Sequence, residues 1–427
     1  MRLNYKRTFF VGLAFMSIQA FWQLYNYVIP LILEHTFRLS EDIIGYVMAA
    51  DNVLALFLLP LFGALSDKTH TRLGRRTPYI LIGTVLAAAL MVVVPVADWN
   101  KNFPLFVVGL GVLLLVMSTY RSPAVALMPD VTPKPLRSKA NAVINLMGAI
   151  GGIFALGVIT FLLPKIDVTT GEKPQSYLLV FAIIAVFMLV AALVLPLTVK
   201  ENKLVAEMPP EPVEDAEKGS SGKLPRPVKK SLIFMLLSVA LWYMAYNAVD
   251  SAYSRYVLDV WGVDESLGST MMIVAMAVAT ISYVPIGIIS SSVGRKKVIL
   301  GGVIMMGVAF AAGVLFTSYT PLAYVVMGVI GIGWAAINVN SYPMVVEMSR
   351  GSDVGKYTGY YYTFSMAAQV ATPILSGYLF KHFSYRVLFP YAVVFTALAF
   401  VTMLMVKHGD VKAEKKASLL ENFDVDD

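Results

Sequence analysis

The sequence predicts an all-α membrane protein of twelve transmembrane helices, arranged as two six-helix bundles about a pseudo-two-fold axis, with both termini in the cytoplasm. Hydrophobic residues make up 58% of the 427 residues and charged residues only 14%, which is more apolar surface than a soluble domain can bury. Apolar stretches of about 20 residues, long enough to cross a bilayer core, recur along the chain on both sides of one long polar segment.

These stretches are continuously apolar rather than alternating with polar residues, which favours helices over a β-barrel. The first stretch lacks a small-residue cleavage site and is long enough to span a membrane, so we expect a retained helix rather than a signal peptide. The expected spans are residues 8–33, 43–66, 78–97, 103–129, 140–163, 177–198, 231–257, 267–292, 297–317, 321–348, 355–380 and 384–407.

Lysine and arginine predict the orientation. If both ends lie inside, the inner segments hold 26 of the 34 basic residues and the outer loops hold six. Such an excess is typical of the cytoplasmic side. The net charge of +7 is therefore a topology signal and not the footprint of a nucleic-acid-binding protein. The chain has no cysteine and four scattered histidines, a pattern that supports neither a metal site nor a hydrolytic site.

The long polar segment at 199–230 divides the chain. It is rich in proline, glycine, serine and charged residues, a composition typical of a flexible linker. We therefore expect four parts, namely a first six-helix bundle at 1–198, a cytoplasmic linker at 199–230, a second six-helix bundle at 231–407 and a cytoplasmic tail at 408–427.

A basic loop with two glycines joins the second and third spans. It reads Gly63-x-x-x-Asp67-Lys68, followed further on by Gly74-Arg75-Arg76. The corresponding loop of the second half contains Gly287 and then Gly294-Arg295-Lys296-Lys297. The glycines are eleven residues apart in the first loop and seven apart in the second, so the first loop carries a four-residue insertion. Glycines at these places let neighbouring helices approach closely.

The two loops resemble those of the major facilitator superfamily. The longer first loop resembles that of the sucrose–proton symporters of plants and their bacterial relatives, within the glycoside–cation symporter branch. The resemblance implies a major facilitator fold, in which two parallel halves work as an alternating-access carrier with the substrate site between them near the midplane. It covers the whole chain as a fold and is specific for the second to fifth helices.

The same resemblance implies a cytoplasmic gate network that latches the two bundles together in one state of the transport cycle. The alternative interpretation is that these are solvated interfacial charges that only set the topology. The residues expected in the gate are Gly63, Asp67, Gly74, Arg75, Arg76, Asp130, Arg137 and Glu347.

Three charged residues inside the predicted spans are candidates for proton coupling, because a charge in the bilayer is costly and is usually kept for function. Asp51 and Asp250 lie in the outer halves of the second and seventh spans, and Arg121 lies near the middle of the fourth. A carboxyl group whose arginine partner comes and goes can take up a proton on one side of the membrane and release it on the other.

Polar and aromatic faces on several spans predict a sugar site. Amides and carboxylates hydrogen-bond hydroxyl groups, and aromatic rings stack on the apolar face of a pyranose. The alternative is that the amides join helices and the aromatic residues form interfacial belts. The residues expected to bind substrate are Gln19, Gln23, Asn26, Asn145, Tyr243, Tyr246, Asn247, Trp334, Asn338 and Gln369.

Two departures from the related families bear on the coupling ion. The cation-site aspartates of the melibiose–sodium branch would fall at Ala55 and Leu59, neither of which can bind sodium. The helix-four arginine of the plant sucrose symporters would fall at Val125, one turn after Arg121. We therefore expect protons rather than sodium as the coupling ion, and no other cofactor.

The sequence thus predicts a transporter and not an enzyme, since no nucleotide loop, metal cluster or nucleophile–base pair is visible. The predicted function is proton-coupled symport of a neutral sugar, a glucoside or disaccharide, by a monomer that crosses the cell inner (plasma) membrane many times. The alternative on the same fold is a proton-coupled exporter of amphipathic small molecules, and a second is a non-transporting membrane protein such as a sensor. The amides of the first span, which has no intramembrane acid, favour sugar over the exporter's substrates.

Overall fold

The computed structural model describes residues 3–162, 176–208, 224–263, 265–349 and 353–410. Within these ranges the chain forms helices and connecting turns, with no strand. The first set of long helices is α1 (Tyr5–Leu31, continued by the π-helical turn Ile32–Thr36), α2 (Glu41–Asp67), α3 (Thr77–Trp99), α4 (Phe103–Asp130), α5 (Arg137–Leu162) and α6 (Leu178–Thr198).

The second set follows a short helix, α7 (Glu201–Ala206). It consists of α9 (Arg226–Trp261), α10 (Glu265–Val293), α11 (Arg295–Leu315), α12 (Leu322–Glu347), α13 (Val354–His382) and α14 (Leu388–Leu404). Local sequence accounts for several helix ends. The side chains of Asn4 and Asn102 cap α1 and α4 by accepting from backbone N–H groups three residues on. Gly262, with φ of 67°, ends α9 in the left-handed conformation that favours glycine.

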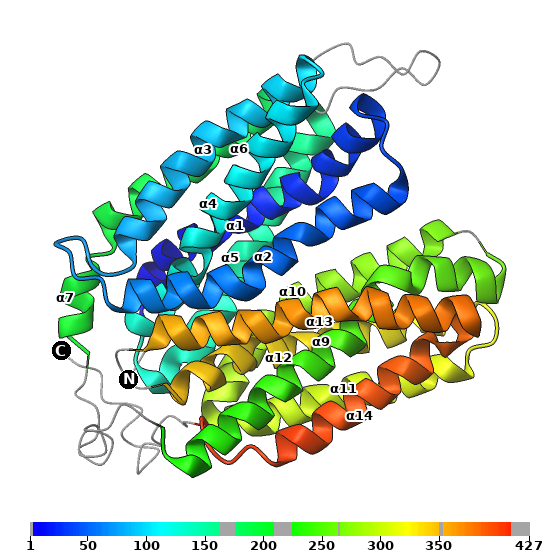
Figure 1. Cartoon of the computed structure of the whole chain (residues 1–427). Coiled ribbons are helices and arrows are strands. Elements are labelled where there is room, and N and C mark those ends of the chain that lie inside the picture. Colours follow the sequence, from blue (N-terminus) through cyan, green and yellow to red (C-terminus); the bar gives the residue numbers. More distant parts are fainter. Residues whose placement is uncertain (1–2, 163–175, 209–223, 264, 350–352, 411–427) are drawn as a thin grey trace.

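The helices form two groups, α1–α6 and α9–α14, which meet mainly where α2 packs on α13 and α5 packs on α10. Figure 1 shows the groups converging at the end where α1 begins and spreading apart at the other. Each group buries small and apolar side chains among its own helices, and the outward faces carry exposed apolar residues such as Phe57, Phe161 and Leu197. Outward apolar faces of this kind suit a lipid environment.

Eleven helices of the described chain are long and apolar enough to cross a membrane. The span expected at 355–380 is observed as helix α13, but α13 is not among those eleven. It is rich in tyrosine, threonine and serine, and it packs against α2, α4, α9 and α12. An inner position of this kind lets a helix carry polar residues, and α13 as the twelfth span stays a prediction.

The segment expected to be a flexible linker is partly folded, which corrects that expectation for its first residues. Helix α7 packs on the first group, where its Glu201 accepts hydrogen bonds from the residues at the start of α3. This packing leaves Glu201 only 1% exposed. Helix α9 also begins within the expected linker, at Arg226. Composition could not reveal this, since the carboxylate of Glu201 looks like any surface charge in sequence. Residues 209–223, the rest of the linker's proline- and glycine-rich part, lie outside the described residues.

Candidate functional site

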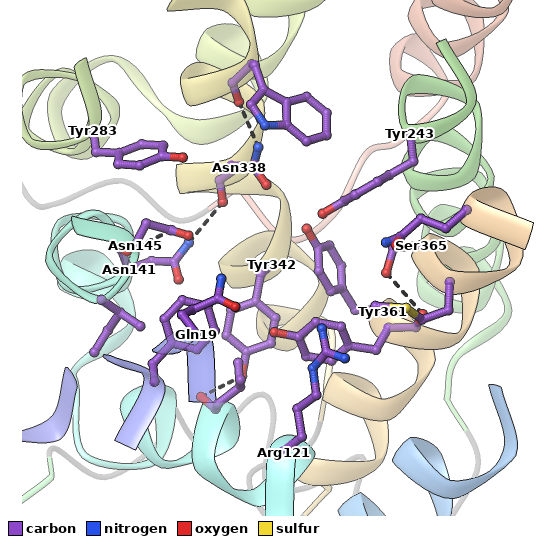
Figure 2. A pocket seen from close by; sticks show the side chains of 17 residues that line it. Gln19, Arg121, Asn141, Asn145, Tyr243, Tyr283, Asn338, Tyr342, Tyr361 and Ser365 are labelled. Carbon is purple, nitrogen blue, oxygen red and sulfur yellow. Dashed lines mark hydrogen bonds between the residues drawn. The ribbon is translucent and has the colours of Figure 1, made fainter. Parts of the chain in front are cut away.

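A cavity of about 240 Å³ lies between the two helix groups. The first group contributes residues of α1, α4 and α5, and the second contributes residues of α9, α10, α12 and α13, so the cavity depends on both groups being present. Figure 2 shows the side chains converging on it. The lining consists of Phe15, Gln19, Arg121, Val125, Asn141, Ile144, Asn145, Tyr243, Tyr283, Trp334, Asn338, Tyr342, Tyr361, Tyr362, Ser365, Met366 and Gln369.

Aromatic rings form one wall of this cavity. Trp334 stacks on Tyr246 with ring centroids 3.9 Å apart and planes 5° from parallel, and it meets Tyr243 edge-on at 5.1 Å. The hydroxyl groups of Tyr243 and Tyr361 point toward one another in Figure 2. The Tyr361 hydroxyl also lies 3.0 Å from the Ser341 hydroxyl. These contacts hold the rings in place and keep an aromatic surface beside several hydroxyl groups.

Three asparagines are oriented by bonds to backbone carbonyls. The Asn141 amide nitrogen donates to the carbonyl oxygens of Asn338 and Val339, at 3.0 and 2.9 Å, and so joins α5 to α12. The Asn145 and Asn338 amide nitrogens each donate to the carbonyl one turn earlier in their own helix, at 2.9 and 3.1 Å. These bonds use only the amide nitrogens, so the side-chain oxygens keep their capacity as acceptors.

Six of the predicted substrate residues line the cavity, namely Gln19, Asn145, Tyr243, Trp334, Asn338 and Gln369. Four do not, namely Gln23, Asn26, Tyr246 and Asn247. Geometry accounts for the difference. Asn26 is about 10 Å farther along α1 than Gln19 at 1.5 Å per residue, and Tyr246 stands behind Trp334 as its stacking partner. A polar stripe predicts which face of a helix is used but not at which depth.

Four tyrosines of the lining are not among the predicted substrate residues, namely Tyr283, Tyr342, Tyr361 and Tyr362. Tyr342 belongs to the same helix as the predicted gate residue Glu347, and its hydroxyl donates to the Val125 carbonyl across the two groups at 3.1 Å. Tyr283 is a lone tyrosine on an apolar stretch, which in sequence is indistinguishable from an ordinary packing residue. Tyr362 follows Tyr361 in a run of three tyrosines, and the run does not indicate which of them faces inward.

Arg121 lies in the cavity, while the two candidate aspartates lie outside its lining. The Arg121 guanidinium sits 5.0 Å from the ring centroid of Trp22 in α1 and 5.2 Å from that of Tyr362 in α13. Asp51 is within electrostatic reach of Arg121 and Tyr25, and its Oδ1 is buried with no hydrogen-bond partner in the described part of the chain. Asp250 is exposed and lies within electrostatic reach of Tyr246.

The predicted gate residues form two clusters, and the first centres on Arg76. Its guanidinium binds the Asp67 carboxylate at 2.5 Å and the Asp130 carboxylate at 2.7 Å, with its side chain fully buried. Burial works against the charge of Arg76, but the carboxylates of Asp130 and Asp67 outweigh it and hold its pKa above the usual range. Asp67 also accepts hydrogen bonds from the backbone N–H groups of Gly355 and Lys356, both at 2.8 Å, and so reaches the start of α13.

The Arg75 side chain pairs within the first group. Its guanidinium donates to both oxygens of Asp130, at 2.7 and 3.0 Å. Both residues belong to the first group, so this pair braces the loop against α4 and does not bridge the groups. The resemblance named members of this network but no pairs, and sequence alone could not tell which acid each arginine contacts, because Arg75 and Arg76 are neighbours.

The second cluster bridges the groups directly. Glu347 at the end of α12 lies 3.2 Å from Arg137 of α5 and 3.2 Å from Arg295 of α11. Arg295 is 1% exposed and donates to the Ser138 hydroxyl at 2.8 Å and to the Lys134 carbonyl at 2.5 Å. Arg295 was not among the predicted gate residues. Its place after Gly294, in the repeat of the first loop, was the signal that could have identified it.

Glycines allow the close approach on which these contacts depend. A Cβ added to Gly63 would overlap the carbonyl oxygen of Gly355, and one added to Gly359 would overlap the backbone of Pro60. A Cβ on Gly287 would meet the Cβ of Ala142 at 2.6 Å. α2 and α13, and likewise α5 and α10, therefore touch backbone to backbone or nearly so at this end of the molecule.

Glu201 of α7 caps the beginning of α3. Its carboxylate accepts hydrogen bonds from the backbone N–H groups of Arg75, Arg76 and Thr77, at 2.8 to 3.1 Å, and from the Thr77 hydroxyl at 2.8 Å. The start of a helix favours negative charge because its first N–H groups lack helical partners. Gly74, with φ of 116°, leaves the space that the carboxylate occupies.

Comparison of the chain with known proteins identifies related families and structures. The MFS/sugar transport protein family matches residues 10–349. Among individual proteins, sucrose transport protein SUC3 of Arabidopsis thaliana is 26% identical over 137 residues, which are 28% of this chain and 23% of that protein. Solute carrier family 45 member 3 of Mus musculus is 31% identical over 153 residues, covering 33% of this chain and 26% of that protein. The chain therefore spans about a quarter of the length of these two relatives.

Solved structures extend the likeness to the whole fold. The major facilitator transporter FucP in its outward conformation has a TM-score of 0.76 at 15% identity, covering 95% of this chain and all of FucP. The human organic anion transporter MFSD10 has a TM-score of 0.70 at 15% identity, with the same coverage. At such identities the likeness shows the fold. Since the family match extends over most of the chain, this protein belongs to the MFS/sugar transport protein family of the major facilitator superfamily.

Proposed function

We propose that this transporter imports a neutral sugar, a glucoside or disaccharide, by proton-coupled symport through alternating access. The observation that carries the proposal is the cavity between the two helix groups, where an aromatic wall and several amides surround a single arginine. The ring of Trp334, which Tyr246 supports from behind, lines the cavity and suits stacking of a pyranose ring. Gln19, Asn145 and Gln369 bring amide groups to the same cavity, from α1, α5 and α13.

Asp51 and Arg121 supply the coupling in this proposal. Among the described residues, the buried Oδ1 of Asp51 has no hydrogen-bond partner and no carboxylate lies within ion-pair distance of Arg121. The two groups are thus close enough to interact but are not joined. Protonation of Asp51 lets it enter the occluded state as a neutral group, and approach of Arg121 favours release of that proton on the other side. Asp250 remains a second candidate.

The structure supports assignment to an outward-facing state. The two gate clusters hold the groups together at the end where α1 begins, and that end is cytoplasmic in the proposed topology of twelve spans. Opening of this end requires the bonds of Asp67 and Glu347 to break. We also propose that the transporter is a monomer of the plasma membrane, with the two helix groups as its two bundles.

Sodium coupling is not favoured. Ala55 and Leu59, at the positions of the cation-site aspartates in the melibiose branch, are 4% and 0% exposed and pack with Met366 in an apolar cluster. They offer no oxygen ligand, and sodium needs several. The exporter alternative also receives less support, because apolar side chains contribute only Phe15, Val125, Ile144 and Met366 to the lining.

Uptake of labelled sucrose, maltose and trehalose into proteoliposomes tests this proposal. The assay compares vesicles with and without an imposed inward proton gradient. We expect accumulation of at least one of the sugars above its external concentration, and loss of that accumulation when a protonophore is added. Absence of uptake of all three by folded protein would favour the exporter, which a screen of amphipathic compounds would then address.

A further inference from the structure

A second cavity lies at the end of the molecule where the gate is closed. It has a volume of about 370 Å³ and is formed by the start of α1, the end of α6 and helix α7. Figure 1 shows α7 at this end, beyond the long helices of the first group. The cavity is separate from the proposed sugar site, with which it shares no residue.

The charge of this cavity is strongly positive. Lys6 and Arg7 reach it from α1, and Lys200 and Lys203 reach it from α7 and the residue before it. Glu207 is the single acid in the lining. It lies 3.8 Å from Lys203, but the two side chains are 54% and 71% exposed, so water screens the pair and it neutralises little charge.

Two of these cations lie at the start of a helix, where the helix dipole disfavours positive charge. Lys6 and Arg7 occupy the first turn of α1, which contains no acidic residue. Cations at a helix start are repelled by the helix dipole. The positive-inside rule explains an excess of basic residues on this side of the membrane, but it does not explain why four of them line one hollow. An anion in the cavity would compensate the repulsion.

The surroundings of the cavity indicate the source of that anion. Phe9 and Leu197, next in sequence to lining residues of α1 and α6, are 45% and 78% exposed. Such apolar surface beside the hollow lies where acyl chains would run in a membrane. A phosphate group with attached acyl chains therefore matches both parts of this surface, whereas free phosphate matches only the basic part.

We propose that the cavity binds the phosphate headgroup of an anionic phospholipid. Lys6, Arg7, Lys200 and Lys203 contact the phosphate oxygens by charge-assisted hydrogen bonds, and the acyl chains lie along the apolar faces of α1 and α6. The same lipid touches α7, whose Glu201 caps α3. Bound lipid therefore steadies the helix that holds the loop with the first gate cluster, and favours the state in which this end is closed.

Binding of short-chain phosphatidylglycerol to the purified full-length protein in neutral detergent tests the proposal. The readout is the midpoint of thermal unfolding at increasing lipid concentration, which gives an apparent Kd. Phosphatidylcholine with the same chains and inorganic phosphate serve as the two comparison ligands. We expect saturable stabilisation by phosphatidylglycerol and little by either comparison ligand. Equal stabilisation by phosphatidylcholine would overturn the proposal, and equal stabilisation by inorganic phosphate would assign the site to a free anion instead.

Matched variants locate the site. Lys6→Gln combined with Lys203→Gln should weaken phosphatidylglycerol binding by roughly 30-fold, at about 1 kcal/mol per basic residue near a charged membrane surface. Lys229→Gln combined with Lys230→Gln removes two exposed charges from the start of α9 and should leave the affinity unchanged. An equal loss in both variants would show a general effect of surface charge and contradict a defined site.

A third variant tests whether loss of binding in the double glutamine variant comes from loss of charge rather than from misfolding. Lys203→Arg keeps the charge and the donors, so it should bind phosphatidylglycerol with nearly the affinity of the natural protein. If Lys203→Arg lost binding as severely as the double glutamine variant while both unfolded at the same temperature without lipid, a charge-based site would be contradicted.

Discussion

Asp67 and Gly355 are joined by a hydrogen bond of 2.8 Å from the Gly355 N–H group to the Asp67 carboxylate, although 288 residues separate them in sequence. The bond connects the end of α2 to the start of α13, where the first N–H groups of a helix favour a negative partner. Arg76 holds the same carboxylate from the other side. The two helix groups are therefore fastened through a helix start, and not only through pairs of charged side chains.

Gly355 should be essential for the closed contact at this end. An added Cβ would overlap the Gly63 carbonyl and press on Arg76, and such overpacking costs about 1–3 kcal/mol. Gly355→Ala should therefore shift the protein about tenfold or more toward the state that is open at this end. Gly377→Ala in the same helix is the control, since its Cβ would meet nothing within 4 Å.

Thiol labelling measures that shift. The natural chain has no cysteine, so Ser365→Cys in the cavity lining supplies a single thiol. An external, membrane-impermeant maleimide should label this cysteine more slowly in the Gly355→Ala background than in the Gly377→Ala background. Equal labelling rates in the two backgrounds would contradict the role given to Gly355.

Glu347 should matter more than its single charge suggests. Its side chain is 1% exposed and faces both Arg137 and Arg295. Glu347→Gln removes the carboxylate from the buried guanidinium of Arg295 and from the partly buried one of Arg137, and loss of one partner from a buried pair costs about 3–5 kcal/mol. We expect a lower midpoint of thermal unfolding and slow transport with near-normal substrate affinity. Glu34→Gln, whose side chain is 58% exposed, should change neither quantity, and similar losses in both variants would be evidence against the second cluster as a gate.

Glu201 should stabilise the loop between α2 and α3. Replacing it by glutamine removes the charge from a helix cap that accepts several hydrogen bonds, at a cost of about 1–2 kcal/mol. Glu201→Gln should therefore lower the unfolding midpoint and the maximal transport rate. Glu34→Gln, whose side chain is 58% exposed and lies outside both cavities, is the control. An unfolding midpoint unaffected by Glu201→Gln would contradict the capping role.

Trp334 should determine substrate affinity through its ring. Trp334→Ala removes the ring that Tyr246 supports and that lines the cavity, and it should raise the Kd for sugar about tenfold, as expected when an aromatic contact and its buried area are lost. Trp334→Phe keeps part of the aromatic surface, so its Kd for sugar should lie between those of the natural protein and Trp334→Ala. Trp99→Ala, at the exposed end of α3, should leave the Kd unchanged. Equilibrium binding of the transported sugar checks this, and an unchanged Kd in Trp334→Ala would remove the ring from the site.

Sequence predicted the fold well because membrane spans are set by composition over long stretches. The apolar runs coincide with the long helices, and the positions of Gly63 and Gly294 marked the two related loops. It was harder to predict how deep along its helix a polar side chain lies and which residue it contacts. Tyr246 and Trp334 looked equivalent in sequence, and only packing shows that one faces the cavity and the other supports it. Glu201 was missed because its burial depends on a short helix docking beneath a distant loop.

Proton movement driven by sugar tests the central claim most directly. Proteoliposomes that contain a pH-sensitive dye receive a substrate sugar on the outside with no imposed gradient. The account predicts acidification of the vesicle interior with the natural protein. In Asp51→Asn it predicts no acidification, while sugar exchange continues. If sugar entered the vesicles without any change of internal pH, or if Asp51→Asn acidified them as fast as the natural protein, the proposed coupling would be contradicted.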